Sequence, residues 1–338
     1  MTAAKAEQRP RITGKFVLSG IQPSGVQHLG NYFGAVRQFI ALQDGNKAAY
    51  FMADLHSLTS IRDAKKRREL TRGVALDFLA LGVDPKRSIL FRQSDLPEVT
   101  ELAWILTTVT PMGLLQRAVS FKDKLAQGLS PDHGLFAYPV LQAADILIWN
   151  ADCVPVGQDQ KQHLEMTRDI AVKFNATYSE VFKLPEPLIL EEVGSIPGSD
   201  GKKMSKTAGN GIEMFAPDKT LKKQIMGIVT DSKGVDEPKD PKTSTIFTLY
   251  SLFANPEERA ALAHAFEKGG LGYGDAKKAL HEKVTAYFAP ARAKRSELES
   301  RPDTVEDILR DGAARAREAT AKLMEDVRTA AGVGPVRK

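Results

Sequence analysis

Cysteine is almost absent from this chain. Cys153 is the single cysteine among 338 residues, so neither an intrachain disulfide nor a cysteine-based zinc or iron–sulfur site can form. It lies in the mostly apolar stretch Ala151–Val156, where a buried packing role is favoured over that of a reactive nucleophile. This cysteine usage fits a reducing compartment, and we expect a cytoplasmic protein.

Long apolar runs are absent as well. No stretch of 18 or more apolar residues occurs, so we expect no membrane span. Residues 1–14, MTAAKAEQRPRITG, lack the apolar core of a secretion signal and predict a short disordered leader. The net charge of +5 is modest, and it permits contact with nucleic acid without indicating it.

Short apolar runs, in contrast, recur between stretches of helical periodicity. Hydrophobic residues make up 42% of the chain and charged residues 26%, the balance of a globular protein with room for two domains. Alternating strands and helices predict a parallel sheet covered on both faces. We therefore expect a Rossmann-like, doubly wound α/β domain over residues 15–212, with ligands at the carboxyl ends of its strands. The expected strand cores are Phe16–Leu18, Ala49–Met52, Ile89–Phe91, Val154–Val156 and Pro187–Leu190.

Strand signals fade after residue 212. Residues 213–338 predict an all-helical C-terminal domain, interrupted by the loop Asp231–Pro241, which is rich in Pro, Gly and charged residues. The last helix carries one regular apolar stripe, and we expect that stripe to pack back on the first domain. The expected helices are Thr220–Val229, Ile246–Phe253, Pro256–Phe266, Gly274–Phe288 and Val305–Ala331.

A glycine-rich turn follows the first strand, in the stretch Ser19–Asn31. Its glycines allow the backbone to approach a ligand, and the helix that begins beyond it presents N–H groups to an anion. His28 and Asn31 lie three residues apart, so both can point into one pocket. The spacing matches neither the dinucleotide-binding fingerprint nor the P-loop. Alone, such a turn is more often structural than functional.

A second stretch, GKKMSKTAGN at residues 201–210, places Lys202, Lys203 and Lys206 around Ser205. The preceding residues are too rich in Gly, Pro and Ser for a stable helix or strand. Most such lysine runs are solvated surface charge. The alternative is a flexible clamp for a polyphosphate.

Together, these two stretches resemble the paired signatures of class I aminoacyl-tRNA synthetases, usually written HIGH and KMSKS. Two further stretches, Tyr138–Leu147 and Val154–His163, are similar to the tryptophan-specific branch of that family. The resemblance extends from about Val17 to the final helix. It implies a tryptophan–tRNA ligase that activates L-tryptophan with ATP and Mg²⁺ and then transfers it to the terminal ribose of its tRNA. It also implies a homodimer, and a helical domain that reads the anticodon.

The resemblance assigns site residues by position. Asp145 would accept a hydrogen bond from the indole N–H, although one Asp on a helix is more often a surface residue. Asp159 would hold the ribose of ATP, or merely cap a helix, and His163 is interpreted as structural; no metal site is expected. The catalytic residues would be His28, Asn31, Lys203 and Lys206. The ATP-binding residues would be Gln22, Pro23, Ser24, Gly30, Asn31, Gly157, Gln158, Asp159, Ile196, Lys203, Met204, Ser205, Lys206 and Thr207. The tryptophan-binding residues would be Leu18, His56, Tyr138, Gln142, Asp145, Val154, Val156 and Gln160.

Two positions depart from the family signatures. Asn31 replaces the second histidine and Thr207 replaces the last serine, but both keep a hydrogen-bonding side chain. A tyrosine-specific ligase is the nearest alternative, and the apolar surroundings of Asp145 argue against it. A paralogue that binds RNA or tryptophan without catalysis is the other, and the intact His28, Lys203 and Lys206 argue against that.

Overall fold

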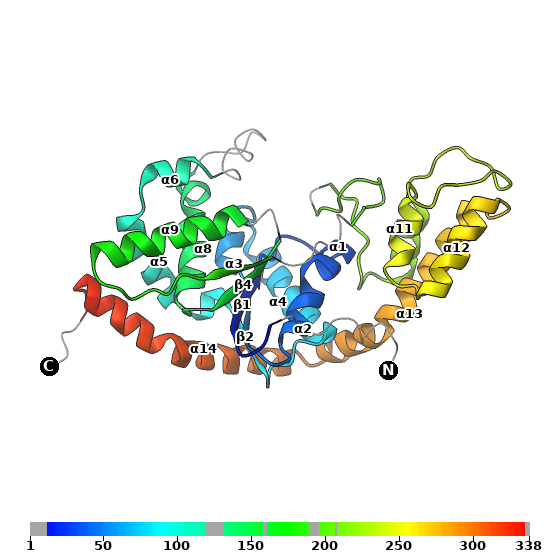
Figure 1. The fold of residues 1–338 in the computed structure, drawn as a ribbon. Helices are drawn as coiled ribbons and strands as arrows, with labels where there is room; N and C mark the ends of the chain where they lie inside the picture. The colour runs from blue at the N-terminus through cyan, green and yellow to red at the C-terminus, as the bar shows by residue number, and fades with distance from the viewer. Residues whose placement is uncertain (1–11, 119–131, 158–160, 190–195, 207, 335–338) are drawn as a thin grey trace.

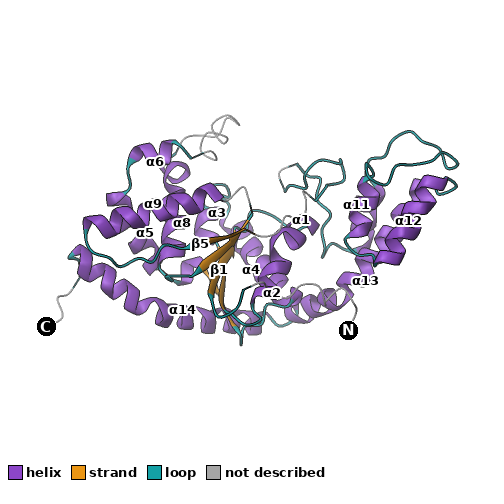
Figure 2. Cartoon of the chain, viewed as in Figure 1, coloured by secondary structure: helices purple, strands orange, loops and turns teal. Residues whose placement is uncertain are grey.

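Five parallel strands form one sheet in the order β3-β2-β1-β4-β5 (Figures 1 and 2). The computed structural model describes residues 12–118, 132–157, 161–189, 196–206 and 208–334. All five predicted strand cores are confirmed within these ranges, while Leu190 lies outside them. The strands are β1 (Phe16–Ile21), β2 (Lys47–Met52), β3 (Ser88–Arg92), β4 (Cys153–Val156) and β5 (Glu186–Ile189).

The strand order reverses direction between β1 and β4. From β1 the chain moves outward to β2 and β3, and it then returns to the other side of β1 for β4 and β5. Such a reversal opens a crevice at the carboxyl ends of the central strands, where α/β folds bind ligands. The connecting segments are α1 (Leu29–Asn31), the π-helix η2 (Tyr32–Val36), α2 (Arg37–Leu42), α3 (Asp54–Ser57), α4 (Ala64–Leu81), η3 (Gln93–Asp95), α5 (Glu98–Val109), α6 (Met112–Gln116), α8 (His133–Leu147) and α9 (Lys161–Thr177).

Successive strand residues enter two separate hydrophobic cores, as the pleat of a strand requires. Val17 and Tyr50 belong to the core that also contains buried residues of α2 and α4. Their neighbours Leu18 and Phe51 belong to the core shared with α5, α8 and α9. The sheet is therefore covered on both faces, and the doubly wound α/β prediction is confirmed.

The region after residue 212 is helical, as predicted. The helices are α10 (Asp218–Met226), α11 (Thr245–Ser251), α12 (Pro256–Lys268), α13 (Tyr273–Glu299) and α14 (Pro302–Ala331). The predicted end of α13 at Phe288 is wrong, because the helix continues through Pro290 for another nine residues. A proline usually ends or kinks a helix. Here the extra turns pack on α4, where Arg295 forms an ion pair with the buried Asp77 (2.7 Å).

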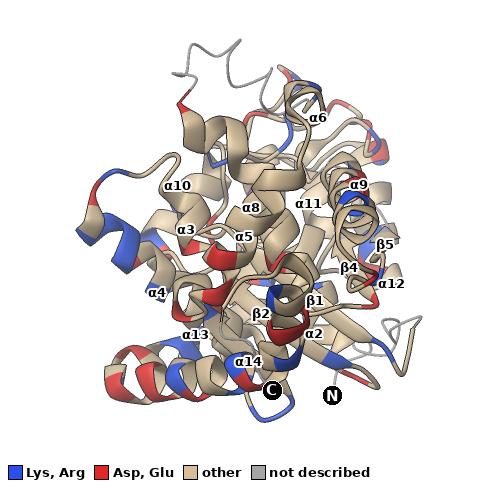
Figure 3. Ribbon diagram, turned by 90° about the vertical axis from the view of Figure 1, so that its left-hand side faces the viewer, with Lys and Arg blue, Asp and Glu red and all other residues tan. Residues whose placement is uncertain are grey.

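Helix α14 returns from the helical region and lies along the edge strand β3 (Figure 1). Gly312 makes this approach possible, since a Cβ atom there would lie 1.9 Å from the carbonyl oxygen of Leu90. Arg315 donates to the carbonyl oxygens of Pro85 and Ser88, so the open edge of the sheet is covered. Acidic and basic residues alternate along the exposed sides of α13 and α14 (Figure 3).

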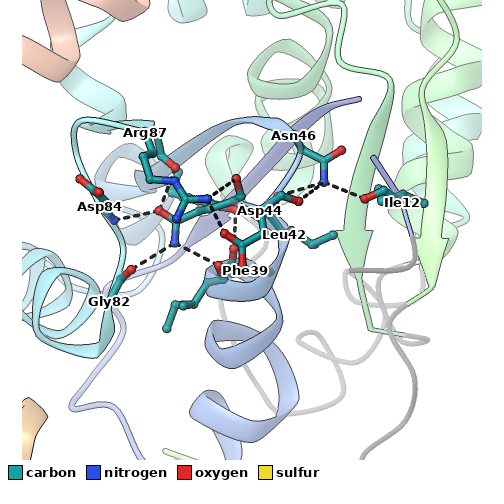
Figure 4. A network of polar contacts seen from close by, with 12 residues as sticks. Ile12, Phe39, Leu42, Asp44, Asn46, Gly82, Asp84 and Arg87 are labelled. Atoms are coloured by element: carbon teal, nitrogen blue, oxygen red, sulfur yellow. Dashed lines mark hydrogen bonds and ion pairs between the residues drawn. The ribbon is translucent and has the colours of Figure 1, made fainter. Parts of the chain in front are cut away.

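A polar network joins the turns at the amino ends of β2 and β3 (Figure 4). Gln43 donates to Gly82 O and accepts from Asp84 N, and Arg87 donates to Gln43 O and pairs with Asp44. These bonds fix the ends of the strands that lie opposite the crevice. Within the described part of the chain, no helix is long and apolar enough to cross a membrane.

Candidate active site

A cavity of about 860 Å³ opens at the carboxyl ends of β1 and β4, where the strand order reverses. Residues from both sequence signatures and from α8 meet in its wall. The predicted residues that line it are Leu18, Gln22, Ser24, His28, Asn31, His56, Tyr138, Gln142, Asp145, Val154, Gly157, Lys203, Met204, Ser205 and Lys206. Segments up to 188 residues apart in sequence, Leu18 to Lys206, therefore share one site.

His28 and Asn31 form a reciprocal cap where the helical segment 29–42 begins. The Asn31 N–H donates to His28 Nδ1 (3.3 Å), and the His28 N–H donates to Asn31 Oδ1 (3.1 Å). Burial and the nearby Lys206 charge lower the pKa of His28 to about 4, so the ring is neutral at pH 7. Because Nδ1 accepts a bond, the ring proton resides on Nε2, which can donate to a ligand in the cavity.

The lysine loop lies against the glycine-rich turn. Met204 Sδ accepts the Gly30 N–H (3.4 Å), and Lys206 Nζ lies 3.4 Å from Ser24 Oγ. Burial lowers the pKa of Lys206 to about 8, with the charge of Asp77 acting against that effect. The two signatures are thus in direct contact, and Lys206 is charged at neutral pH.

Asn210, which sequence reasoning quoted without giving it a role, organises this loop. Its side chain is buried, accepts the Ser205 N–H (2.8 Å) and donates to Lys203 O (3.2 Å) and Asp200 Oδ1 (2.7 Å). A Cβ on Gly198 would lie 2.5 Å from the Asn210 side chain. The backbone on both sides of Met204 is therefore held by a single amide.

Asp145 is buried, so the surface alternative is excluded. It projects from α8 with 4% of its surface exposed and receives a hydrogen bond from His56 Nε2 at Oδ2 (2.9 Å). Burial raises the pKa of its carboxyl, while the hydrogen bonds from His56 and Gln93 act in the opposite direction. A buried carboxylate of this kind is costly unless N–H donors surround it.

Gln93 supplies the other donors, and sequence reasoning did not identify it. Its Nε2 lies 2.7 Å from Asp145 Oδ1 and 2.8 Å from Oδ2. Its Oε1 accepts the backbone N–H groups of Leu55 (3.0 Å) and His56 (3.4 Å), which fixes the orientation of the amide. The available signal was position, since Gln93 directly follows β3 at the carboxyl edge of the sheet.

Tyr138 and His163 form a second polar pair in the wall. The Tyr138 hydroxyl lies 2.7 Å from His163 Nε2, and the Tyr138 ring packs edge-on against His56. His163 is buried and has this hydroxyl as a partner, in keeping with the structural interpretation. Among the described residues, no group of three or more His, Cys, Asp or Glu side chains could hold a metal ion.

The other predicted site residues divide into two sets. Pro23, Gly30 and Ile196 support the wall instead of lining it; Ile196 O, for example, accepts the Met204 N–H (2.8 Å). Gln158, Asp159, Gln160 and Thr207 lie outside the described residues, as does the side chain of Val156.

Comparison with known proteins places the chain in one family. The family of "tRNA synthetases class I (W and Y)" matches residues 14–289. A tryptophan–tRNA ligase of Rhodopirellula baltica is 53% identical over 94% of this chain and 99% of its own length, and one from Fusobacterium nucleatum is 52% identical over 94% and 97%.

Solved structures agree with these relatives. A tryptophanyl-tRNA synthetase from Campylobacter jejuni, complexed with ADP and tryptophan, is 47% identical with a TM-score of 0.90 and covers 94% of this chain and 100% of that one. A tyrosyl-tRNA synthetase from Archaeoglobus fulgidus shares the fold at 21% identity and a TM-score of 0.61. The chain belongs to the class I tRNA synthetases for tryptophan and tyrosine.

Proposed function

We propose that this chain is a tryptophan–tRNA ligase. It activates L-tryptophan with ATP, releases pyrophosphate, and transfers the tryptophanyl group to the 3′-terminal ribose of its tRNA. The observation that carries this proposal is one cavity with two chemically different ends. Asp145 and His56 form the indole end, with Gln93 buried behind the carboxylate, whereas His28, Lys203 and Lys206 form the phosphate end. The relatives named tryptophan–tRNA ligase support the choice of amino acid.

At the indole end, Asp145 accepts the indole N–H, and counting its bonds identifies the oxygen. Oδ2 already accepts from both His56 and Gln93, whereas Oδ1 accepts from Gln93 alone. Oδ1 therefore has the freer lone pair. A charge-assisted bond there selects an aromatic side chain with a donor at that position, and an analogue without the donor leaves the carboxylate underpaired.

Gln93 and His56 donate hydrogen bonds to the Asp145 carboxylate, which keeps it ionised and able to accept the indole N–H. Because Gln93 Oε1 is occupied by two backbone N–H groups, its Nε2 must face the carboxylate. His56 Nε2 reaches the same carboxylate from α3. We propose that Tyr138 and Gln160 hold the tryptophan amino group, and that Leu18, Gln142, Val154 and Val156 pack around the ring.

At the phosphate end, three groups stabilise the negative charge that passes from the attacking carboxylate through the α-phosphate to the leaving pyrophosphate. Neutral His28 donates from Nε2, and Lys203 and Lys206 supply positive charge. Asn31 keeps the histidine in the donating tautomer. The N–H groups at the start of the helical segment 29–42 add to the same field.

The remaining nucleotide contacts are proposed from the positions that these residues hold in the family signatures. Gly157, Gln158 and Asp159 hold the ribose. Gln22, Pro23, Ser24 and Gly30 shape the turn beside the phosphates, and Ile196, Met204, Ser205 and Thr207 carry the lysine loop. Mg²⁺ fits this site as a companion of the nucleotide, since it prefers phosphate oxygens and water to an all-protein cage. When bound, it supplies further positive charge to the phosphates.

The reaction proceeds in two displacements at these residues. A carboxylate oxygen of tryptophan attacks the α-phosphorus of ATP, and the bond to the β-phosphate oxygen breaks to release pyrophosphate. The 2′-hydroxyl of the terminal ribose then attacks the activated carbonyl carbon, and AMP leaves. The chain's part is mainly to position the reactants and to stabilise charge, because neither step needs a covalent enzyme intermediate.

The tRNA contacts are assigned by region. We propose that residues 15–212 form the catalytic domain, that residues 213–338 read the anticodon, and that the enzyme works in the cytoplasm as a homodimer.

Trp104 and Met112, on consecutive helices, expose 70% and 62% of their surfaces, which supports a protein partner on that side. Sedimentation equilibrium tests the dimer directly.

Pyrophosphate exchange tests the proposed reaction. The native chain should exchange labelled pyrophosphate into ATP only when tryptophan is present, and tyrosine should support little exchange. Exchange with tyrosine in place of tryptophan would assign the chain to the other specificity of its family. If neither amino acid supports exchange, the chain would be a binding protein without catalytic activity.

A further inference from the structure

The start of α4 is the most strongly basic surface that the proposed roles leave unused. Six of the eleven residues from Arg62 to Arg72 are Arg or Lys. Arg62 pairs with Asp132, and Arg67 donates to the carbonyl oxygen of Ile61. The side chains that remain exposed are Lys65, Lys66, Arg68 and Arg72, which we call the α4 basic surface.

These four side chains have no acidic partner within 4.0 Å in the part of the chain that the structure describes. Asp63 is occupied by the Lys66 backbone N–H, and Glu69 forms no ion pair with its basic neighbours. On α13 and α14, in contrast, Lys294, Arg310 and Lys322 each pair with a carboxylate on their own helix. Figure 3 shows the first turns of α4 as a continuous basic stretch at the margin of the molecule.

The position of this surface is electrostatically unfavourable for the isolated protein. Lys65, Arg68 and Arg72 lie at i, i+3 and i+7, so they share one face and repel one another. Lys65 and Lys66 also lie in the first turn of α4, where the helix dipole disfavours cations. A surface of this kind is stabilised when a polyanion binds to it.

The α4 basic surface follows closely in sequence after a segment that lines the active site. The segment Leu58–Asp63 joins α4 to α3, which carries His56, and Thr59 of this segment lines the cavity. Gln22 of the glycine-rich turn donates to His56 O (3.2 Å) and reaches Ser60 Oγ (3.5 Å). The cavity wall and the first lysine of the surface are therefore only six residues apart, Thr59 to Lys65.

We propose that the α4 basic surface binds the phosphate backbone of the acceptor stem of the tRNA, next to the point where its single-stranded 3′ end enters the cavity. The inference rests on the proposed function, because the RNA end must reach the activated amino acid. An A-form stem presents two rows of phosphates and few readable base edges to side chains on a helix. Lys65, Lys66, Arg68 and Arg72 thus contribute affinity and orientation, while base recognition comes from elsewhere.

A charge-neutralising variant tests this assignment. In Lys65→Gln/Lys66→Gln/Arg68→Gln, tryptophan-dependent pyrophosphate exchange should stay within about twofold of the native rate, whereas the KM for tRNA in charging should rise roughly tenfold or more. The slope of log affinity against log salt should become shallower by about 2–3, since each lost phosphate contact removes about 0.7–0.9. The matched control, Lys47→Gln/Lys86→Gln/Lys173→Gln, removes the same charge from exposed positions elsewhere in residues 15–212, away from the cavity lining, and should keep the native slope.

Two RNA hairpins distinguish the acceptor stem from other parts of the tRNA. The α4 variant should bind a hairpin containing only the acceptor stem and its 3′ end more weakly, and should bind an anticodon-stem hairpin as the native chain does. Weakened binding of the anticodon hairpin alone, a native salt slope, or an equal loss in the control variant would each overturn the proposal. Loss of binding to anionic phospholipid vesicles with unchanged RNA binding would assign the surface to a membrane and also overturn it. Exchange in the native chain is measured first, so failure of the proposed function is seen independently.

Discussion

The two ends of the cavity are built in different ways. At the indole end, Asp145, Gln93 and His56 project from helices, two of them short helices that directly follow strands, and each side chain is already hydrogen bonded. At the phosphate end, Lys203, Lys206 and Ser24 lie on loops, and the Lys203 side chain is exposed. The side chains of the rigid end are already ordered when the chain has folded. Binding there needs no further ordering, so one hydrogen-bond donor on the ligand can decide which amino acid is selected. A loop end can change its contacts as charge moves from substrate to product.

This comparison assigns a different kinetic signature to each end. Contacts made equally to the substrate and to the transition state change KM, whereas contacts that strengthen in the transition state change kcat. We expect variants at the indole end to act mainly on the KM for tryptophan. Variants at the phosphate end should act mainly on the rate of adenylate formation.

Lys206→Ala is expected to have the largest effect. Removing one charge that stabilises the transferring phosphates should raise the activation free energy by about 3 kcal/mol, which lowers the exchange rate roughly a hundredfold. Ground-state ATP binding should weaken far less, as measured by equilibrium titration of the variant. Equal losses in rate and in affinity would show that the loop attracts ATP only by charge, and the contrast between the two ends would disappear.

Asp145→Ala tests the indole end. It removes the acceptor for the indole N–H and leaves the Gln93 and His56 donors unpaired. The fall in kcat/KM for tryptophan should therefore correspond to a loss of roughly 1–3 kcal/mol in transition-state stabilisation. Analogues whose ring lacks the N–H should react poorly with the native chain and lose little further in the variant. This non-additivity is expected when both changes remove the same bond. Additive losses would place the indole elsewhere in the cavity.

How far the sequence alone predicted this site depended on the kind of contact. His28, Asp145 and Lys206 lie in local motifs, so a resemblance carried by short stretches found them. Gln93 and Asn210 act through partners that folding brings together: Gln93 reaches Asp145 across 52 positions, and Asn210 matters because a loop folds around its amide. No periodicity or spacing encodes such contacts.

The fold showed the same division. Strand positions followed from apolar runs, and the helical character of the region after residue 212 followed from periodicity. The continuation of α13 past Pro290 was missed, because its cause is tertiary: the ion pair of Arg295 with Asp77 on α4 stabilises turns that local propensity disfavours.

Gln93 variants sharpen the account of the indole end. Gln93→Leu removes both donors to the Asp145 carboxylate, so the KM for tryptophan should rise about tenfold while kcat changes little. Gln93→Glu places two carboxyl groups in contact, and they should share one proton at low pH. Its KM for tryptophan should therefore rise as pH increases and that proton is lost. A KM independent of pH in this variant would limit Gln93 to a structural role.

The smallest expected effect is a pH dependence that separates the two ends. Lys206, whose pKa is lowered to about 8 by burial, carries its charge below that pH and loses it as the pH rises further. Since kcat/KM for ATP reports the enzyme without bound ATP, its value at saturating tryptophan should fall about fourfold between pH 7 and 8.5. Bound phosphates favour the charged amine, so kcat should decline only at higher pH. His28, with a pKa of about 4, stays neutral throughout this range and contributes no change.

Lys206→Arg keeps its charge at every pH tested and should abolish the decline, even if the bulkier guanidinium lowers the absolute rate. An identical decline in Lys206→Arg would assign the titration to another group and remove Lys206 from the free-enzyme profile.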